Sequence, residues 1–183
     1  MRIVLNRYND VVLTNLLNDY RCNFHGRSCK VRTNYKGLKE FEVAFYDEGL
    51  PHLLGLHYVG KNRAGSRILE DIDSGRMTAQ TIMKHAEFRQ KDIRNRILLY
   101  PFVYEVFVDQ KIKVCVPMDN VKPNNMRLSC VFTKKGTKEE IVLGLKRDNR
   151  DGIFKPATLH SNKKAKYTLL KCSKVESIIW DEV

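Results

Sequence analysis

The period of the hydrophobic residues changes once along the chain, from a helical period in the middle to strand alternation near the end. Between about residues 50 and 108, apolar residues recur three or four positions apart, as Ile68, Leu69 and Ile72 do, which predicts amphipathic helices. From about 111 to 181 the segments read as strands with short connections, which favours antiparallel pairing. We therefore expect an α+β fold, a helix-flanked antiparallel sheet with a central helical lobe, as one domain over residues 1–183.

Local signals indicate where single elements begin and end. Apolar spacing predicts a helix over 11–20, and alternation predicts a strand over 40–47. Pro51 is tolerated in a first helical turn and can start a short helix that carries His52. Thr78 is a suitable N-cap for the next helix, and Pro101 must bend or end the long helix after Lys91. The expected strands of the last third are 111–117, a hairpin over 127–148 and 166–182.

Basic charge is the strongest global property of the chain. It has 33 Lys and Arg against 21 Asp and Glu, a formal net charge of +12. Such an excess favours polyanionic partners, because each neutralised phosphate releases counterions. The charge is densest in 147–167, which we interpret as a loop between two strands. The opening residues lack the apolar core of a signal peptide and no apolar run spans about 18 residues, so we expect a cytoplasmic protein without a membrane segment.

The cysteines are scattered and odd in number. This pattern fits reduced thiols better than a disulfide framework. Cys22, His25 and Cys29 are close in sequence, but no fourth ligand follows nearby and the spacing matches no common zinc motif. We expect no metal site and no cofactor. The five cysteines are Cys22, Cys29, Cys115, Cys130 and Cys172.

The polar residues favour RNA cleavage without a metal. Motifs for phosphate-binding loops, zinc proteases and nucleophilic serines are missing from the sequence. A metal-dependent nuclease needs clustered carboxylates, whereas Asp148 and Asp151 each neighbour an arginine. Attack of a ribose 2′-OH on its own phosphate needs instead a base, an acid and cations, and histidine and lysine or arginine supply these.

One candidate group lies in the segment "GLPHLLGLHYVGKNRAGSR" (49–67). His52 is the lead catalytic candidate, and the cations behind it, Lys61, Arg63 and Arg67, are candidate phosphate contacts. His57 lies about 140° around a helix from His52, so both rings face the same site only if the helix ends at Gly55 and the chain turns. Each has an ordinary alternative, a buried histidine or a solvated charged face.

A second candidate group lies in the basic segment 147–167. "TLHS" can coordinate a phosphate through hydroxyl groups, with His160 as a proton donor, or can be a simple polar turn. We expect Tyr167 to open the last strand and to stack on a base, or else to cover the sheet edge. The candidates here are Arg147, Thr158, His160, Ser161, Lys163, Lys164 and Tyr167.

Two short patterns resemble a known group of nucleases. "PHLLGL" (51–56), followed by helices and then by a strand-rich end with "PATL" (156–159), is similar to the phage-associated Barnase–EndoU–colicin–RelE-like families, and closest to the group marked by His-Leu-x-Gly-Leu. The resemblance implies a RelE- or barnase-like RNase fold, with His52 at the motif histidine and Thr158 at the motif hydroxyl. It also implies a toxin-like or anti-phage role, with room for a neutralising antitoxin or immunity partner.

The sequence thus predicts a metal-independent RNA endonuclease that cleaves by 2′-OH transesterification. The main alternative is a non-catalytic nucleic-acid-binding module with the same charge, and a second is a basic protein that docks an acidic protein partner. The sequence leaves the oligomeric state open.

Overall fold

The computed structural model describes residues 2–61 and 63–182. The first half of the chain alternates between helix and strand before a run of short helices begins. Its early elements are η1 (Tyr8–Asp10), α1 (Leu13–Asn23), β1 (Ser28–Thr33), η2 (Lys36–Leu38), β2 (Glu40–Ala44) and η3 (Asp47–Gly49). The run of helices is α2 (Leu50–Leu53), α3 (Leu56–Val59), α4 (Gly65–Asp73), α5 (Ala79–Met83), α6 (Ala86–Gln90), α7 (Ile93–Leu98) and α8 (Pro101–Phe107).

Five further strands complete a single closed sheet. They are β3 (Val114–Pro117), β4 (Cys130–Lys135), β5 (Glu140–Arg147), β6 (Phe154–Asn162) and β7 (Ser173–Trp180). The strand order is β1-β2-β6-β5-β4-β3-β7, and β7 pairs with β1. Neighbours are antiparallel except β2 and β6, which meet in parallel at Val43 and Phe154. The α+β class is confirmed. The expectation of an antiparallel sheet flanked by helices is corrected, because β1 and β2 from the N-terminal part join the other strands and close the sheet into a barrel with one parallel contact.

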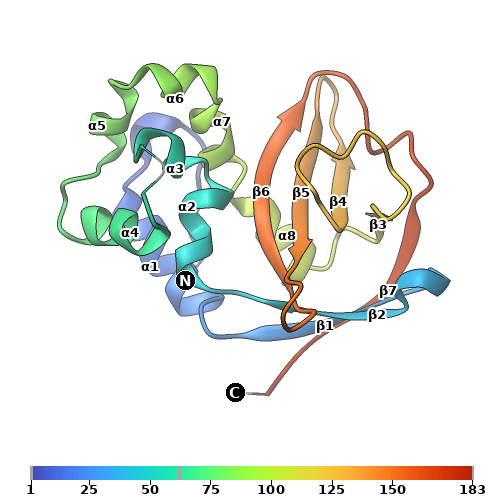
Figure 1. Ribbon diagram of the computed structural model, residues 1–183. Coiled ribbons are helices and arrows are strands. Elements are labelled where there is room, and N and C mark those ends of the chain that lie inside the picture. Colours follow the sequence, from blue (N-terminus) through green and yellow to red (C-terminus); the bar gives the residue numbers. More distant parts are fainter. Residues whose placement is uncertain (1, 62, 183) are drawn as a thin grey trace.

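The helices and the sheet lie side by side, and α8 joins them. Figure 1 shows α1 to α7 on one side, β3 to β6 upright on the other, and β1, β2 and β7 crossing below. On α8, the Phe107 ring lies 5.0 Å from that of Phe45 and 5.5 Å from that of Phe132 on β4. The indole of Trp180 on β7 donates to the Phe107 carbonyl at 3.0 Å. A continuous apolar core therefore runs from the helices into the sheet.

The structure confirms two helix boundaries that were predicted from single residues, Thr78 and Pro101. Thr78 caps α5, since its hydroxyl accepts from the Thr81 amide at 3.1 Å, and the Thr81 hydroxyl accepts from the Thr78 amide in return. Pro101 ends the preceding helix and stands at the start of α8. None of the helices in the described residues has the length and apolarity needed to cross a bilayer.

The interpretation of 147–167 as a loop is wrong for its central part. β6 occupies Phe154–Asn162 and buries Phe154, Pro156 and Thr158 in alternation. Its register with β5 shifts between Gly144 and Leu145, opposite Ala157. Such an irregularity accommodates a proline within a sheet and often occurs beside functional sites. The last strand is shorter than expected, and Tyr167 lies before it, buried with only 2% of its surface exposed.

A buried carboxylate fixes the segment between β6 and β7. Glu140, at the start of β5, is 2% exposed and accepts hydrogen bonds from the side chain of Asn162 and from the backbone amides of Lys166, Tyr167 and Thr168. Burial raises the pKa of Glu140, but these donors outweigh it and the net pKa lies below the ordinary value of 4.5. The charged form is therefore the form that the fold stabilises.

Replacement of Glu140 by glutamine tests this arrangement. Glutamine places an NH₂ group against backbone N–H donors, so we expect Glu140→Gln to lower the free energy of unfolding at pH 7 by about 2 kcal/mol, the order of a charge-assisted hydrogen bond. Because the folded pKa is depressed, the wild-type advantage exists above pH 4.5 and disappears as the pH falls through the folded pKa. Urea denaturation at several pH values measures both effects. Glu176→Gln, at an exposed position on β7, is the control, and equal losses in the two variants would contradict the assignment.

Candidate active site

A sharp turn at Gly55 brings two histidines together. α2 ends at Leu53, and Gly55 adopts a left-handed φ of +76° before α3 begins at Leu56. Glycine tolerates this conformation, and a Cβ here would lie 2.9 Å from Cδ of Arg96. The ring centroids of His52 and His57 consequently lie 4.5 Å apart. The condition under which His57 would join His52 is therefore met.

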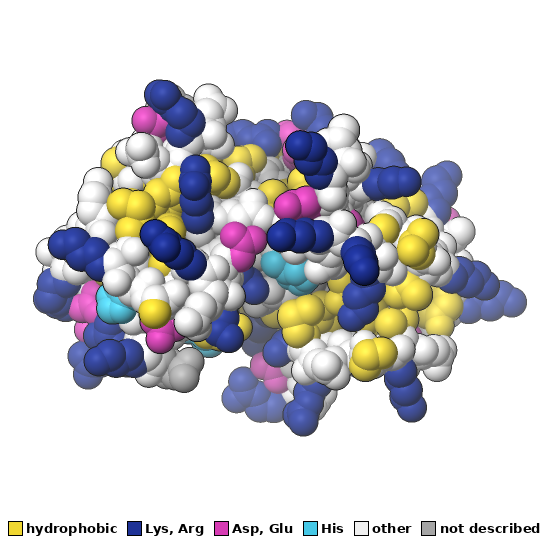
Figure 2. All heavy atoms as spheres, turned by 90° about the horizontal axis from the view of Figure 1, so that it is seen from above, with side chains coloured by type: hydrophobic (Ala, Val, Ile, Leu, Met, Phe, Trp, Pro, Cys, Tyr) yellow, Lys and Arg dark blue, Asp and Glu magenta, His cyan; other side chains and the backbone are white. Residues whose placement is uncertain are grey.

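These histidines line a cavity of about 470 Å³ between the helices and the sheet. It is formed by α2, α3, α7, β5, β6 and the segment before β4. Figure 2 shows lysine and arginine spread over both halves of the molecule, with a hollow between the halves. Among the described lining residues there is no aspartate or glutamate. The side chains relevant to chemistry are His52, His57, Tyr58, Arg96, Arg127, Lys146 and Thr158.

A chain of polar contacts links α7 to β6 at the wall of this cavity. Arg96 donates through Nη1 to Thr158 Oγ1 at 3.1 Å and through Nε to the carbonyl of Lys91 at 3.1 Å. Thr158 Oγ1 lies 3.4 Å from Nδ1 of His160, two residues along the same face of the strand. Arg96 is thus held in place by two oxygens and keeps further N–H donors for a ligand.

The local environment favours neutral imidazoles. Burial, followed by the charge of Lys146, lowers the pKa of His52, and burial, followed by the charge of His52, lowers that of His57. Burial and then Arg96 lower the pKa of His160 to about 4. All three rings are therefore mainly neutral near pH 7 and able to accept a proton.

The structure does not bring the cations after His57 into this cavity. Lys61 and Arg63 line a separate cavity of about 400 Å³, together with Val59 at the end of α3 and Gly60 directly after it. Arg67 pairs with Glu70 on the surface of α4 at 3.1 Å.

The remaining candidates of the basic segment lie at the two ends of β6 or beyond it. Arg147 stands at the end of β5, beside the turn into β6. Ser161 accepts from Asn95 at 2.7 Å and donates to Glu139. Lys163 and Lys164 are exposed after β6. Tyr167 packs in a small buried cluster with Val131 and Val142, so its ring is not accessible for stacking on a base.

Comparison with known proteins identifies the family of the chain. A family model described as phage-Barnase-EndoU-ColicinE5/D-RelE like nuclease 4 matches residues 12–180. The chain belongs to this nuclease family. Searches of curated proteins and of solved structures gave no match. The resemblance inferred from "PHLLGL" and "PATL" is thereby confirmed, and nucleic acid is the class of substrate that this nuclease family implies.

Several lining residues of this nuclease were missed in the sequence. Arg96 lies in α7 and Lys146 in β5. Each is a charged residue among apolar ones, and this pattern is the usual one for a side chain that faces solvent. Arg127 precedes β4 in a segment without a motif, and Tyr58 follows His57 directly. Only Tyr58 carried a signal, an aromatic ring beside a candidate histidine.

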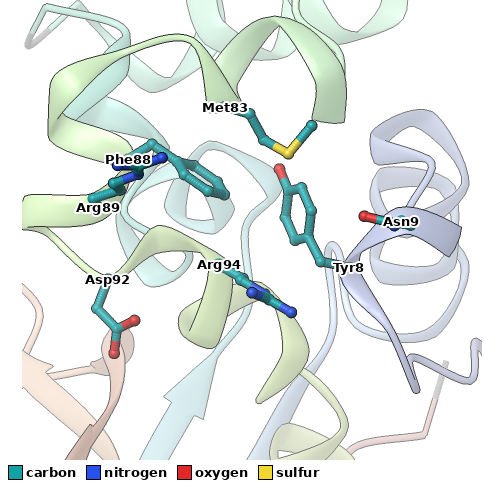
Figure 3. A pocket seen from close by; sticks show the side chains of 7 residues that line it. All are labelled: Tyr8, Asn9, Met83, Phe88, Arg89, Asp92 and Arg94. Carbon is teal, nitrogen blue, oxygen red and sulfur yellow. The ribbon is translucent and has the colours of Figure 1, made fainter.

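A larger cavity elsewhere lacks the groups for nuclease chemistry. It measures about 600 Å³ and lies between η1 and the segment from α5 to α7. Figure 3 shows Tyr8, Met83 and Phe88 turned toward one another there. The Tyr8 hydroxyl donates to the Ala79 carbonyl at 3.0 Å, and the rings of Tyr8 and Phe88 meet edge to face. This cavity is lined without a histidine among the described residues, so we assign the chemistry to the cavity of His52.

The side chains offer little to a metal ion. Within residues 2–61 and 63–182, no three His, Cys, Asp or Glu side chains gather in a way that could hold one. All five cysteines are free thiols, and Cys29, Cys115 and Cys130 are buried.

The charge of Lys146 provides a test of the electrostatics of the cavity. Because this charge contributes to the lowered pKa of His52, we expect Lys146→Gln to raise that pKa toward its ordinary value. NMR titration of the imidazole signals measures it. Lys174→Gln, at an exposed position on β7, removes the same charge far from the cavity and should leave the His52 titration unchanged. An unaltered His52 pKa in Lys146→Gln would show that the two groups do not interact.

Proposed function

We propose that this protein is a metal-independent RNA endonuclease that cleaves by attack of the ribose 2′-OH on the adjacent phosphate. One observation carries the proposal. His52 and His57 face each other in a cavity that also holds Arg96, Lys146 and Thr158 and is lined by no described carboxylate. The site thus combines proton-transfer groups with cations, which this reaction requires.

The histidine pair supplies the proton transfers. One neutral imidazole takes the proton of the 2′-OH while the 2′-oxygen forms a bond to phosphorus. The bond from phosphorus to the 5′-oxygen breaks, and the other imidazole, in its protonated form, gives its proton to the leaving oxygen. The negative charge of a bound phosphate raises the pKa of a nearby imidazole, and the repulsion between two charged rings keeps the second one neutral.

The cations stabilise the charge that develops on the phosphate. Arg96 is pre-positioned by Thr158 and the Lys91 carbonyl, and Lys146 lines the same cavity. A well-placed donor in such a site contributes about 3 kcal/mol to stabilisation of the transition state. Thr158 and His160 act mainly through Arg96 in this proposal, as positioning residues.

Cleavage of RNA in excess EDTA tests the reaction. We expect the wild-type protein to cut RNA, to leave 2′,3′-cyclic phosphate ends and to leave DNA of the same sequence intact, since DNA lacks the nucleophile. His52→Ala and His57→Ala should each lower kcat/KM by about 10² to 10⁴. His25→Asn is the control and should leave cleavage unchanged. In the wild-type protein the Asp47 backbone amide donates to His25 Nδ1 at 3.0 Å, and the side-chain oxygen of asparagine can accept the same hydrogen bond.

Two results would overturn the proposal. Cutting that depends on added magnesium would point to a metal-dependent reaction. Salt-sensitive RNA binding that is equal in the wild-type and His52→Ala proteins, without cleavage in either, would support the non-catalytic binding module instead.

A toxin-like or anti-phage role is part of the same proposal. We expect expression of the wild-type protein in a bacterial host to arrest growth and fragment cellular RNA, and His52→Ala at equal protein level to do neither. Growth arrest by both proteins without RNA damage would contradict the toxin role through RNA cleavage. A co-expressed protein that restores growth would identify a neutralising antitoxin or immunity partner.

A further inference from the structure

A second cavity, beside the one that holds the histidines, contains a pair of fixed arginines. It measures about 400 Å³, and Lys61, Arg63 and Arg76 line it together with Asp71 of α4. Three cations against one carboxylate leave a local excess of positive charge. The cavity therefore favours an anion.

Asp71 holds the two guanidinium groups next to each other. Its Oδ2 lies 2.6 Å from Nη2 of Arg63 and its Oδ1 lies 2.8 Å from Nε of Arg76. The Asp71 side chain is only 12% exposed. Arg63 is fixed a second time, because its Nε donates to the Gly60 carbonyl at 3.0 Å.

The arginines keep donors available for a ligand. The side chains of Arg63 and Arg76 are 48% and 64% exposed, and each guanidinium has five N–H donors, of which these contacts use a part. Two pre-positioned guanidinium groups suit the oxygens of a phosphate, which arginine binds with two parallel hydrogen bonds.

The two cavities meet at one short segment of chain. His57 and Tyr58 line the cavity of the proposed reaction, and the next residues, Val59, Gly60 and Lys61, line the second one. Tyr58 and Val59 are consecutive residues, and consecutive Cα atoms lie about 3.8 Å apart, so the linings of the two cavities adjoin at α3. A strand of RNA held in the first cavity is therefore close enough to continue over α3 into the second.

We propose that the second cavity binds a backbone phosphate of a nucleotide that flanks the cleaved one, through Arg63 and Arg76. The proposal rests on the proposed function, because it concerns the path of the same RNA strand. It assigns Arg63 and Lys61 to the grip on a flanking nucleotide, outside the reacting centre. It also makes single-stranded RNA longer than a dinucleotide the preferred substrate.

Binding of non-cleavable RNA of two lengths tests the second site. The probes are fluorescent 2′-fluoro oligonucleotides of two and of eight nucleotides, and fluorescence anisotropy gives Kd at several salt concentrations. For the eight-nucleotide RNA we expect Arg76→Gln to raise Kd about 10-fold, the loss of one charge-assisted contact, and to reduce the slope of log K against log salt by about 0.7. The dinucleotide should bind as it does to the wild-type protein.

Two further variants complete the experiment. Lys84→Gln removes a charge at the end of α5, at a residue outside the lining of the second cavity, and should bind both probes as the wild-type does. Lys61→Gln should also raise Kd for the eight-nucleotide RNA and not for the dinucleotide, but by a smaller factor than Arg76→Gln. If circular dichroism shows that Arg76→Gln is unfolded, Lys61→Gln replaces it in the test. Equal Kd values for the eight-nucleotide RNA in Lys61→Gln, Arg76→Gln and Lys84→Gln would overturn the proposal. The ion pairs of Asp71 with Arg63 and Arg76 would then have a structural role alone.

Cleavage of a natural dinucleotide, measured in parallel, separates this proposal from the proposed function. If the wild-type protein cleaves it and no variant shows a length-dependent loss of binding, only the second phosphate site fails. If nothing is cleaved but the length-dependent loss occurs, the phosphate site stands and the assigned reaction fails.

Discussion

The parallel contact between β2 and β6 determines where the functional groups lie. Val43 pairs with Phe154, and the rings of Phe41 and Phe154 have centroids 4.5 Å apart. The chain leaves β2 at Ala44 and enters α2 at Leu50, so the first α-helix after β2 lies beside β6. Closure of the sheet thus brings His52 to Thr158, which stands more than one hundred residues further along the chain.

The turn at Gly55 then decides which side chains share the cavity. A continuous helix would direct His57 away from His52, whereas the left-handed glycine turns α3 back and places the two ring centroids 4.5 Å apart, with the ring planes tilted by 32°. The same glycine leaves room for Arg96, whose Cδ would contact any Cβ at this position. Apolar packing of Leu53, Leu54 and Leu56, all fully buried, supports the turn and gives the rings a rigid base.

The distribution of charge matters more here than the net charge of +12. Many cations are paired locally, as Arg21 is with Asp47 and Asp73 and as Lys134 is with Glu105. Surface pairs of this kind contribute little to stability, but they neutralise the field around them. Around His52 the described lining offers Arg96, Arg127 and Lys146 without an acid, so this cavity keeps a positive potential that suits a phosphate.

The sequence by itself predicted the class of the fold, most helices, the strands β2 to β5 and β7, and two candidate motif residues, His52 and Thr158. These follow from local periodicity, capping and short motifs, which act within a few residues. It did not reveal β1, whose alternation over six residues is short, or β6, whose basic composition hid the buried alternation of Phe154, Pro156 and Thr158. Only the tertiary structure decided that the sheet closes, that His57 joins His52, that Arg96 and Lys146 line the cavity and that Tyr167 is buried. Those outcomes depend on contacts between residues far apart in the chain, because sheet closure and the packing of α7 against β6 have no local signature.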